Sequence, residues 1–146
     1  MTRKYESDLE LHNKILKGVK VLADNVASTL GPRGRNVIIR QKGKRQIVTK
    51  DGVTVAKFIE LEDPFEDVGA QIIKQTAAKT NAEAGDGTTT STVLARAILE
   101  KAQKYLIAGA PPIELKRGMD KAVSAIVENL KEISTPIMSQ DDIAHI

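Results

Sequence analysis

The sequence has no cysteine and no tryptophan, and aromatic residues make up only 3% of its 146 residues. Without cysteine, neither a disulfide framework nor a thiolate metal site can form. With so few aromatic residues, the core must be built from aliphatic side chains. The two histidines, His12 and His145, are far apart in the sequence. Because catalytic zinc usually takes three protein ligands, we expect no histidine metal site.

Long apolar runs are also missing. No segment approaches the roughly 20 apolar residues that span a membrane, so we expect no membrane partner. The opening "MTRKYESDLELHNKILKG" has no apolar signal-peptide region and is too acidic for a typical transit peptide. These features predict a cytoplasmic protein or one from a cytosol-like compartment.

The composition that remains is typical of a globular protein. Hydrophobic residues make up 41% of the chain, charged residues 28%, and the net charge is +3. This balance is ordinary for a folded domain, and the length suits a single domain with a modest core. A charge this small does not by itself require a nucleic-acid partner.

Apolar residues recur at spacings of three and four in several segments, a pattern that predicts amphipathic helices. The first helix is expected to be capped by Ser7 or Asp8. Two short apolar runs around a polar, glycine-containing loop predict a β-hairpin. The fold class is therefore predicted to be mainly α with a small hairpin. The expected helices run from about Ser7 to Ser28, Pro64 to Thr80, Thr88 to Ala108 and Ile113 to Ile133, and the strands are Asn36–Arg40 and Gln46–Lys50.

Three segments outside these helices need separate interpretation. A turn is expected at Asp51–Gly52, followed by a run that fits either a strand or a helix. Near the end, Ser139 and Asp142 form a capping-box-like pair that announces another helix. We expect residues 134–146 to be the truncated start of that helix, and a frayed tail is the alternative.

The stretch "GDGTTTST" (85–92) has the features of a phosphate site. Glycines let backbone N–H groups approach a ligand closely, and a helix that begins at the threonines attracts anions. Asp86 would repel a bare phosphate but suits a Mg²⁺ ion that bridges to it. The stretch matches neither a P-loop nor a dinucleotide-binding motif. The plain alternative is an Asp-Gly turn followed by a threonine helix cap.

A second glycine-rich loop, "TLGPRG" (29–34), also lies at a helix end, and "TKDGVTV" (49–55) follows the hairpin. Lys50 is suited to neutralise phosphate charge, and Asp51 to orient a water or a metal-bound group. Taken alone, these residues also fit a polar turn.

The segments "TLGPRGRNVII", "TKDGVTVAKFIELEDPFEDVGAQI", "AGDGTTTSTVLA" and "LKRGMDKAV" together closely resemble the N-terminal part of the equatorial domain of group I chaperonins, the GroEL type. The resemblance runs from about Ile15 to Ile146. It implies a helical domain that binds ATP with Mg²⁺ and K⁺. The implied roles are a catalytic position at Asp51, a magnesium ligand at Asp86, and nucleotide-binding positions at Thr29, Leu30, Gly31, Pro32, Lys50, Asp86, Gly87, Thr88, Thr89 and Thr90.

A complete member of that family is several times longer than this chain. The resemblance implies an ATP-dependent protein-folding subunit of a homo-oligomeric double ring, encoded by a bacterium or phage or found in an organelle matrix. A lid co-chaperonin and unfolded proteins would bind through the apical domain, which is absent here, as is the intermediate domain. We therefore expect residues 1–146 to be the N-terminal portion of the equatorial domain, and not competent for hydrolysis alone. The opening of the chain departs from the usual family opening, which affects ring contacts of the first residues.

Two other functions stay open. The chain is alternatively a stand-alone, shortened chaperonin that acts as a non-hydrolysing ring-assembly or ring-capping module. The basic segment around the hairpin also fits nucleic-acid binding. The lack of aromatic residues for base stacking in this segment argues against that function. Other interpretations of that segment are a solvated hairpin and, from the resemblance, pairing with a neighbouring subunit. Its basic residues are Arg33, Arg35, Arg40, Lys42, Lys44, Arg45 and Lys50.

The apolar stripes on at least four helices would lack the cover that the rest of such a domain gives them. We therefore expect the isolated chain to be marginally stable, molten or self-associating.

Overall fold

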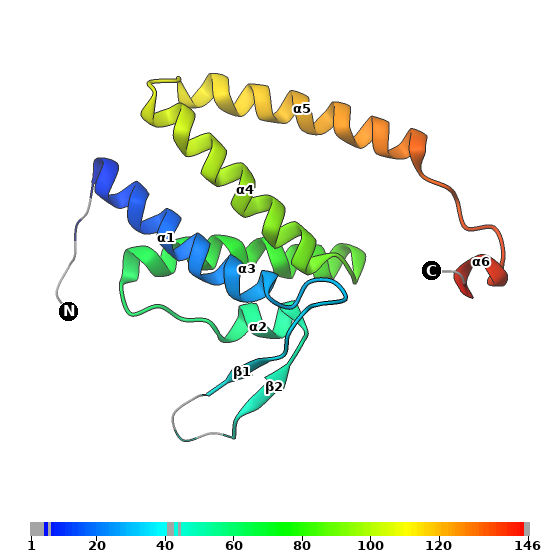
Figure 1. Cartoon of the computed structure of the whole chain (residues 1–146). Helices are drawn as coiled ribbons and strands as arrows, with labels where there is room; N and C mark the ends of the chain where they lie inside the picture. The colour runs from blue at the N-terminus through cyan, green and yellow to red at the C-terminus, as the bar shows by residue number, and fades with distance from the viewer. Residues whose placement is uncertain (1–4, 6, 41–42, 44, 145–146) are drawn as a thin grey trace. The chain divides into compact units, whose positions relative to one another are not determined.

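The computed structural model describes residues 5, 7–40, 43 and 45–144. Within them the chain is mainly helical with one antiparallel hairpin, which confirms the predicted fold class (Figure 1). The chain divides into two compact units, Met1–Lys104 and Tyr105–Ile146. The elements are α1 (Asp8–Ala27), β1 (Val37–Ile39), β2 (Ile47–Thr49), α2 (Gly52–Phe58), α3 (Pro64–Ala84), α4 (Thr88–Ile107), α5 (Pro112–Ile133) and α6 (Gln140–Ala144).

The first unit is organised by the crossing of α1 and α3, which approach each other at two glycines. A Cβ atom on Gly18 would lie 1.7 Å from the backbone oxygen of Glu66, and one on Gly69 would lie 1.9 Å from that of Ile15. Each helix thus presents bare backbone to the other. The close approach brings the apolar stripes of the two helices into direct contact.

The core forms where these stripes meet α2. Fully buried aliphatic side chains on α1 pack against alanines and an isoleucine on α3 and against the inner face of α2, as the scarcity of aromatic residues predicts. Ala95 and Leu99 of α4 pack against the edge of this cluster. The α1 stripe is therefore covered within the first unit, contrary to the expectation that the helical stripes would lack cover. The core residues are Val19, Leu22, Val26, Val55, Ala56, Ala70, Ile73 and Ala77.

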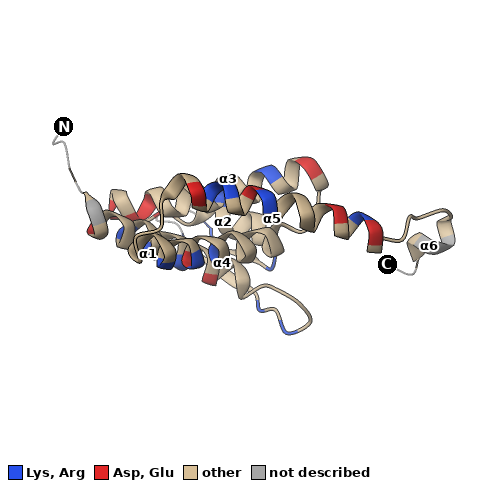
Figure 2. Ribbon diagram, turned by 90° about the horizontal axis from the view of Figure 1, so that it is seen from above, with Lys and Arg blue, Asp and Glu red and all other residues tan. Residues whose placement is uncertain are grey.

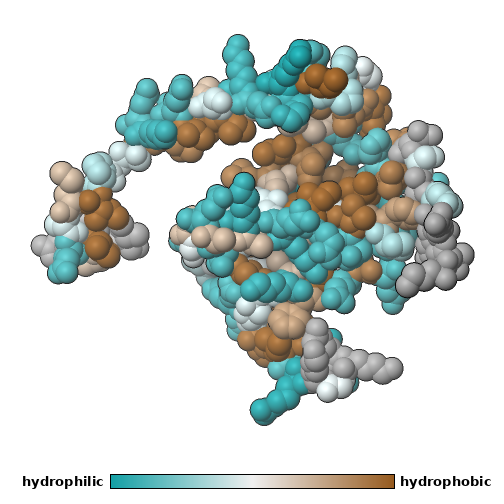
Figure 3. Space-filling view, turned by 180° about the vertical axis from the view of Figure 1, so that it is seen from behind, coloured by the Kyte–Doolittle hydropathy of each residue, from teal (hydrophilic) through white to brown (hydrophobic). Residues whose placement is uncertain are grey.

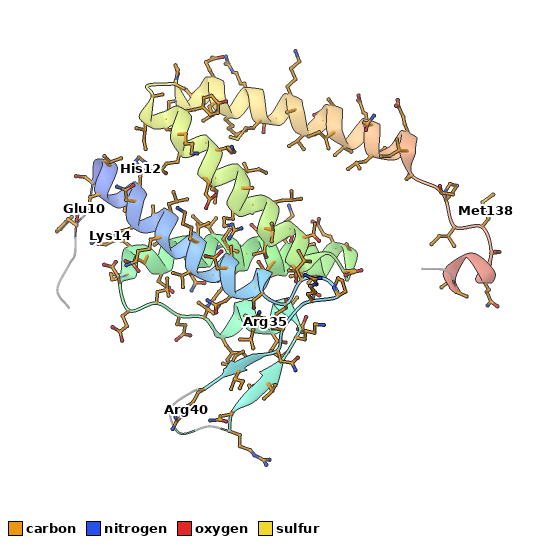
Figure 4. The ribbon with its side chains drawn as sticks, in the orientation of Figure 1. Glu10, His12, Lys14, Arg35, Arg40 and Met138 are labelled. Carbon is orange, nitrogen blue, oxygen red and sulfur yellow. The ribbon has the colours of Figure 1, made fainter. Side chains whose placement is uncertain are left out.

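Ion pairs on the rim of the core join the same helices. Lys14 Nζ lies 3.3 Å from a carboxylate oxygen of Asp63 and 5.5 Å from the centre of the Phe65 ring, and Lys14 projects from α1 in Figure 4. Lys17 Nζ lies 2.5 Å from Glu66, and Arg96 of α4 pairs with Asp24 of α1. Because such pairs are partly exposed, they orient the helices more than they stabilise them.

The hairpin and α2 follow the loop after α1. Val37 pairs with Thr49, Ile38 with Val48 and Ile39 with Ile47, which confirms the predicted hairpin. The hairpin projects away from the helices of its unit (Figure 1). The ambiguous run after Asp51 is a helix, since the Asp51 carboxylate accepts hydrogen bonds from the N–H groups of Val53 and Thr54 and so caps α2.

The ends of α1 and α3 differ from the prediction in detail. Ser7 stands at the cap position of α1, but its side chain makes no capping hydrogen bond. The side chain of Asp8 lies outside the described residues. Helix α3 begins at Pro64 behind an Asp63 cap but continues past Thr80 to Ala84, where Gly85 in the left-handed region stops it. The prediction ended α3 one turn early because Asn81–Ala84 was taken for loop.

The second unit contains α5 and α6. Helix α5 has no buried residue, and apolar side chains gather along one of its sides while polar ones occupy the other (Figure 3). Val123, Ile126, Leu130 and Ile133 are all more than half exposed, so this stripe has no cover among the described residues. The helix predicted from Ser139 and Asp142 forms as α6. In the described part of the chain, no helix has the length and apolar character of a membrane span.

A carboxylate in the first turn of α3 yields a stability prediction. Asp67 Oδ1 accepts a hydrogen bond from Leu61 N at 3.1 Å and ties the preceding segment to α3. This bond, helped by Gln71, lowers the pKa of Asp67 below its ordinary value of 3.8. We expect Asp67→Ala to lower the free energy of unfolding at pH 7 by about 1 kcal/mol.

The effect should depend on pH. Because the folded-state pKa of Asp67 is depressed, its contribution is present above pH 3.8 and is lost as the pH falls through the folded-state pKa. In urea unfolding, the difference in free energy of unfolding between wild type and Asp67→Ala should therefore shrink as the pH falls below this value. A difference that stays constant with pH would show that the carboxylate charge has no part in the effect.

Candidate nucleotide site

A cavity of about 260 Å³ lies in the first unit where three segments meet. These are the loop after α1, the junction between β2 and α2, and the loop between α3 and α4 with the first turn of α4. Two of its walls are therefore helix N-termini. The lining residues are Leu30, Lys50, Asp51, Gly52, Val53, Asn81, Gly85, Asp86, Gly87, Thr88, Thr89 and Thr90.

The loop between α3 and α4 is shaped by two glycines. Gly85 has φ of 70° and Gly87 has φ of 78°, a left-handed conformation that other residues adopt at a cost. Asp86 lies between them, exposed, and its carboxylate accepts a hydrogen bond from Gly87 N at 2.6 Å. The glycines thus turn the chain sharply and place a carboxylate on the cavity wall.

Helix α4 begins immediately after this loop. Its first backbone bond runs from Ser91 N to Gly87 O at 2.8 Å. The N–H groups of Thr88, Thr89 and Thr90 belong to the first turn, and such groups have no partner within the helix. The positive end of the helix dipole adds to them. The wall formed by this turn is suited to bind an anion.

Lys50 and Asp51 form another part of the wall, at the start of α2. The Asp51 carboxylate accepts hydrogen bonds from the Thr54 hydroxyl at 2.5 Å, from Thr54 N at 2.9 Å and from Val53 N at 3.4 Å. The Thr54 hydroxyl has the largest effect and lowers the pKa of Asp51. Burial has the next largest effect and raises this pKa, but the two amides and the charge of Lys57 also lower it, so that the pKa lies below 3.8. Asp51 is therefore ionised at neutral pH and is a weak proton acceptor.

The structure brings together most of the sequence-predicted site residues but not all of them. Leu30, Lys50, Asp51 and the run 86–90 share the cavity wall. Thr29, Gly31 and Pro32 do not line it. The Thr29 hydroxyl donates to Val26 O at 2.7 Å, toward the end of α1. The predicted roles of all these residues stay predictions.

Four lining residues were not singled out as site residues from the sequence: Gly52, Val53, Asn81 and Gly85. Gly52 lies in the motif "TKDGVTV" next to Asp51, and Gly85 lies in "GDGTTTST" next to Asp86. These positions could have identified both glycines as site residues from the sequence. Asn81 became a candidate only when α3 proved to extend to Ala84. This extension puts Asn81 in the last turn, where its backbone oxygen accepts from Gly85 N at 3.0 Å.

The donors at the cavity fit a magnesium ion that arrives with phosphate. Among the described residues there is no group of three or more His, Cys, Asp or Glu side chains that could hold a metal. Mg²⁺ in nucleotide sites is typically bound by one or two carboxylates together with phosphate oxygens and water. Asp86 supplies such a carboxylate on the cavity wall, whereas a metal bound by protein alone would need more ligands.

The basic segment lies beside the cavity. From the end of α1 to Lys50 the sequence contains lysine and arginine and no acidic residue, whereas acidic and basic residues are mixed along α3 and α5 (Figure 2). Arg35 and Arg40 stand at opposite ends of β1 (Figure 4). Ile38 and Val48, which pair across the strands, are 66% and 61% exposed. Lys42 and Lys44 lie outside the described residues.

Both comparisons with known proteins point to chaperonins. A model described as the TCP-1/cpn60 chaperonin family matches residues 22–146. A solved structure described as a group III chaperonin in the open state is similar to the chain, with a TM-score of 0.76 and 26% sequence identity. The similarity covers 88% of this chain and 25% of that one, so the chain spans about a quarter of the length of the solved protein.

Proposed function

We propose that this chain, which belongs to the TCP-1/cpn60 chaperonin family, forms the phosphate- and magnesium-binding part of the ATP site of a protein-folding chaperonin subunit. One observation carries the proposal. Three segments far apart in the sequence converge on a single cavity, and they bring Lys50, Asp51 and residues 86–90 to its wall. The family resemblance implies nucleotide-binding roles for Lys50 and residues 86–90 and a catalytic role for Asp51.

Each wall of the cavity has a proposed role. The first turn of α4, with Thr88, Thr89 and Thr90, holds phosphate oxygens through backbone N–H groups and hydroxyls. Asp86 binds the magnesium ion, which supplies charge neutralisation at the phosphates. Lys50 lies near the phosphates and a potassium ion. Asp51 is held ionised by the N-terminus of α2, so its role is to orient water by its charge rather than to accept a proton.

The remainder of the subunit is proposed to complete the hydrolytic site and to bind the partner proteins. We assign residues 1–146 to the N-terminal portion of an equatorial domain, with residues 134–146 as the start of its next helix. Assignment to group I rests on the four sequence motifs, whereas the solved relative is a group III protein. The hairpin, with exposed Ile38 and Val48, is proposed to pair with a neighbouring subunit of the ring.

The test is purification of the protein from its native source, followed by intact mass, electron microscopy and an ATPase assay. We expect rings, magnesium-dependent ATP hydrolysis and a subunit mass several-fold above the 15.8 kDa of this chain. A 15.8 kDa protein that joins rings of a longer homologue and binds ATP without turnover would favour the ring-assembly alternative. A ring-free protein that does not bind ATP would refute both.

A further inference from the structure

Gly52 and Thr89, two residues of the cavity wall, lie so close together that a side chain on Gly52 would clash with Thr89. Gly52 is the first residue of α2 and is buried, while Thr89 belongs to the first turn of α4. A Cβ atom on Gly52 would lie 2.4 Å from Thr89 Oγ1 and 3.2 Å from Val26 Cγ1. The N-termini of α2 and α4 therefore meet at the one position where α2 has no side chain.

Gly52 is needed for space and not for backbone conformation. Gly85 and Gly87, in the neighbouring loop, have positive φ, whereas Gly52 is helical and is not among the glycines with positive φ. An alanine at this position would be compatible with the backbone of α2. Its only conflict would be with the side chains that face it, and the Thr89 hydroxyl is the closest of them.

The geometry points to Gly52 as a positioning residue, one whose missing side chain lets the Thr89 hydroxyl stand where it can reach a phosphate oxygen. This inference rests on the proposed nucleotide function. Ordinary contacts begin near 3.4 Å, so a methyl group on Gly52 would push the hydroxyl by about 1 Å. Since hydrogen bonds from hydroxyl groups span only about 2.5–3.0 Å, a shift of that size breaks the contact.

The test is a double-mutant cycle in the complete subunit with MgATP as ligand. We expect Gly52→Ala to weaken MgATP binding by about tenfold, because this is the typical effect of losing one hydrogen bond to a charged group. In a Thr89→Ala background the same change should have little effect, because the new Cβ would lie 3.6 Å from the Cβ of residue 89, an ordinary contact. Gly118→Ala on α5, where a Cβ meets nothing within 4 Å, is the control and should leave binding unchanged.

A second readout does not need nucleotide. The methyl resonance of Thr89 in an NMR spectrum should shift in Gly52→Ala and stay in place in Gly118→Ala. Equal MgATP affinity of Gly52→Ala and wild type, or an equal loss in both backgrounds of the cycle, would overturn the positioning role. If wild type does not bind MgATP, the proposed function fails instead, and the methyl shift then decides alone whether Gly52 sets the place of Thr89.

Discussion

Gly69→Ala is expected to lower the free energy of unfolding by about 3 kcal/mol, at the upper end of what overpacking usually costs. The new Cβ would lie 1.9 Å from the backbone oxygen of Ile15. That oxygen belongs to α1 and cannot rotate away as the end of a flexible side chain can. The two helices must therefore separate. Gly18→Ala, whose Cβ would lie 1.7 Å from Glu66 O, should act in the same way.

The size of the effect follows from what lies beside the crossing. Val19 and Ala70, each next to one of these glycines, are fully buried in the core. Separation of α1 from α3 would loosen the packing of that whole cluster. Because domains are stable by only about 5–15 kcal/mol, a loss of this size is a large fraction of the total stability.

Gly118→Ala is the matched control for stability. It makes the same chemical change inside a helix, at a position where the Cβ meets nothing within 4 Å. An alanine there should raise helix stability by about 0.5–1 kcal/mol. Urea unfolding followed by circular dichroism measures both variants. If Gly69→Ala unfolded at the same urea concentration as wild type, the close approach of α1 and α3 would be wrong.

This contact marks the limit of what the sequence could predict of the fold. The stripe on α1, the hairpin and the Asp63–Pro64 start of α3 follow from local periodicity and turn chemistry, and the structure confirms them. Gly18 and Gly69 look like ordinary residues of two helices, since nothing local reveals that they touch. The end of α3 was placed one turn too early, although Asn81–Ala84 contains no strong helix breaker and the helix continues to the cap at Gly85.

The candidate site shows the same division between local and long-range information. The residues around Asp86 could be recognised from their glycines and threonines, because the residues that form a phosphate loop are consecutive in the sequence. The contact of Gly52 with Thr89 joins two helices and could not be read from either segment. Likewise, only the structure shows that Asp51 caps α2, which makes its carboxylate a fixed negative charge at the cavity wall.

Asp86→Asn is expected to weaken magnesium-dependent binding of ATP by on the order of a thousandfold, because opposite charges near a protein surface interact by about 4 kcal/mol at contact distance. Asparagine is close to aspartate in size and still offers an oxygen to Gly87 N, so the loop between Gly85 and Gly87 should keep its shape. What is lost is the charge that faces the cation. Thermal unfolding should therefore change little while the affinity for MgATP falls.

Two further variants separate this role from general electrostatics. Glu83→Gln removes an equal charge from the last turn of α3, where Glu83 pairs with Lys79 at 3.8 Å and does not line the cavity, and should leave the affinity for MgATP nearly unchanged. Asp51→Asn keeps a good helix cap, so it should preserve binding and reduce turnover in the complete subunit. Calorimetric titrations with ATP, with and without magnesium, measure these affinities. If wild type bound ATP equally well after chelation of magnesium, Asp86 would have no metal to hold, and the acidic residue in this glycine loop would need another explanation.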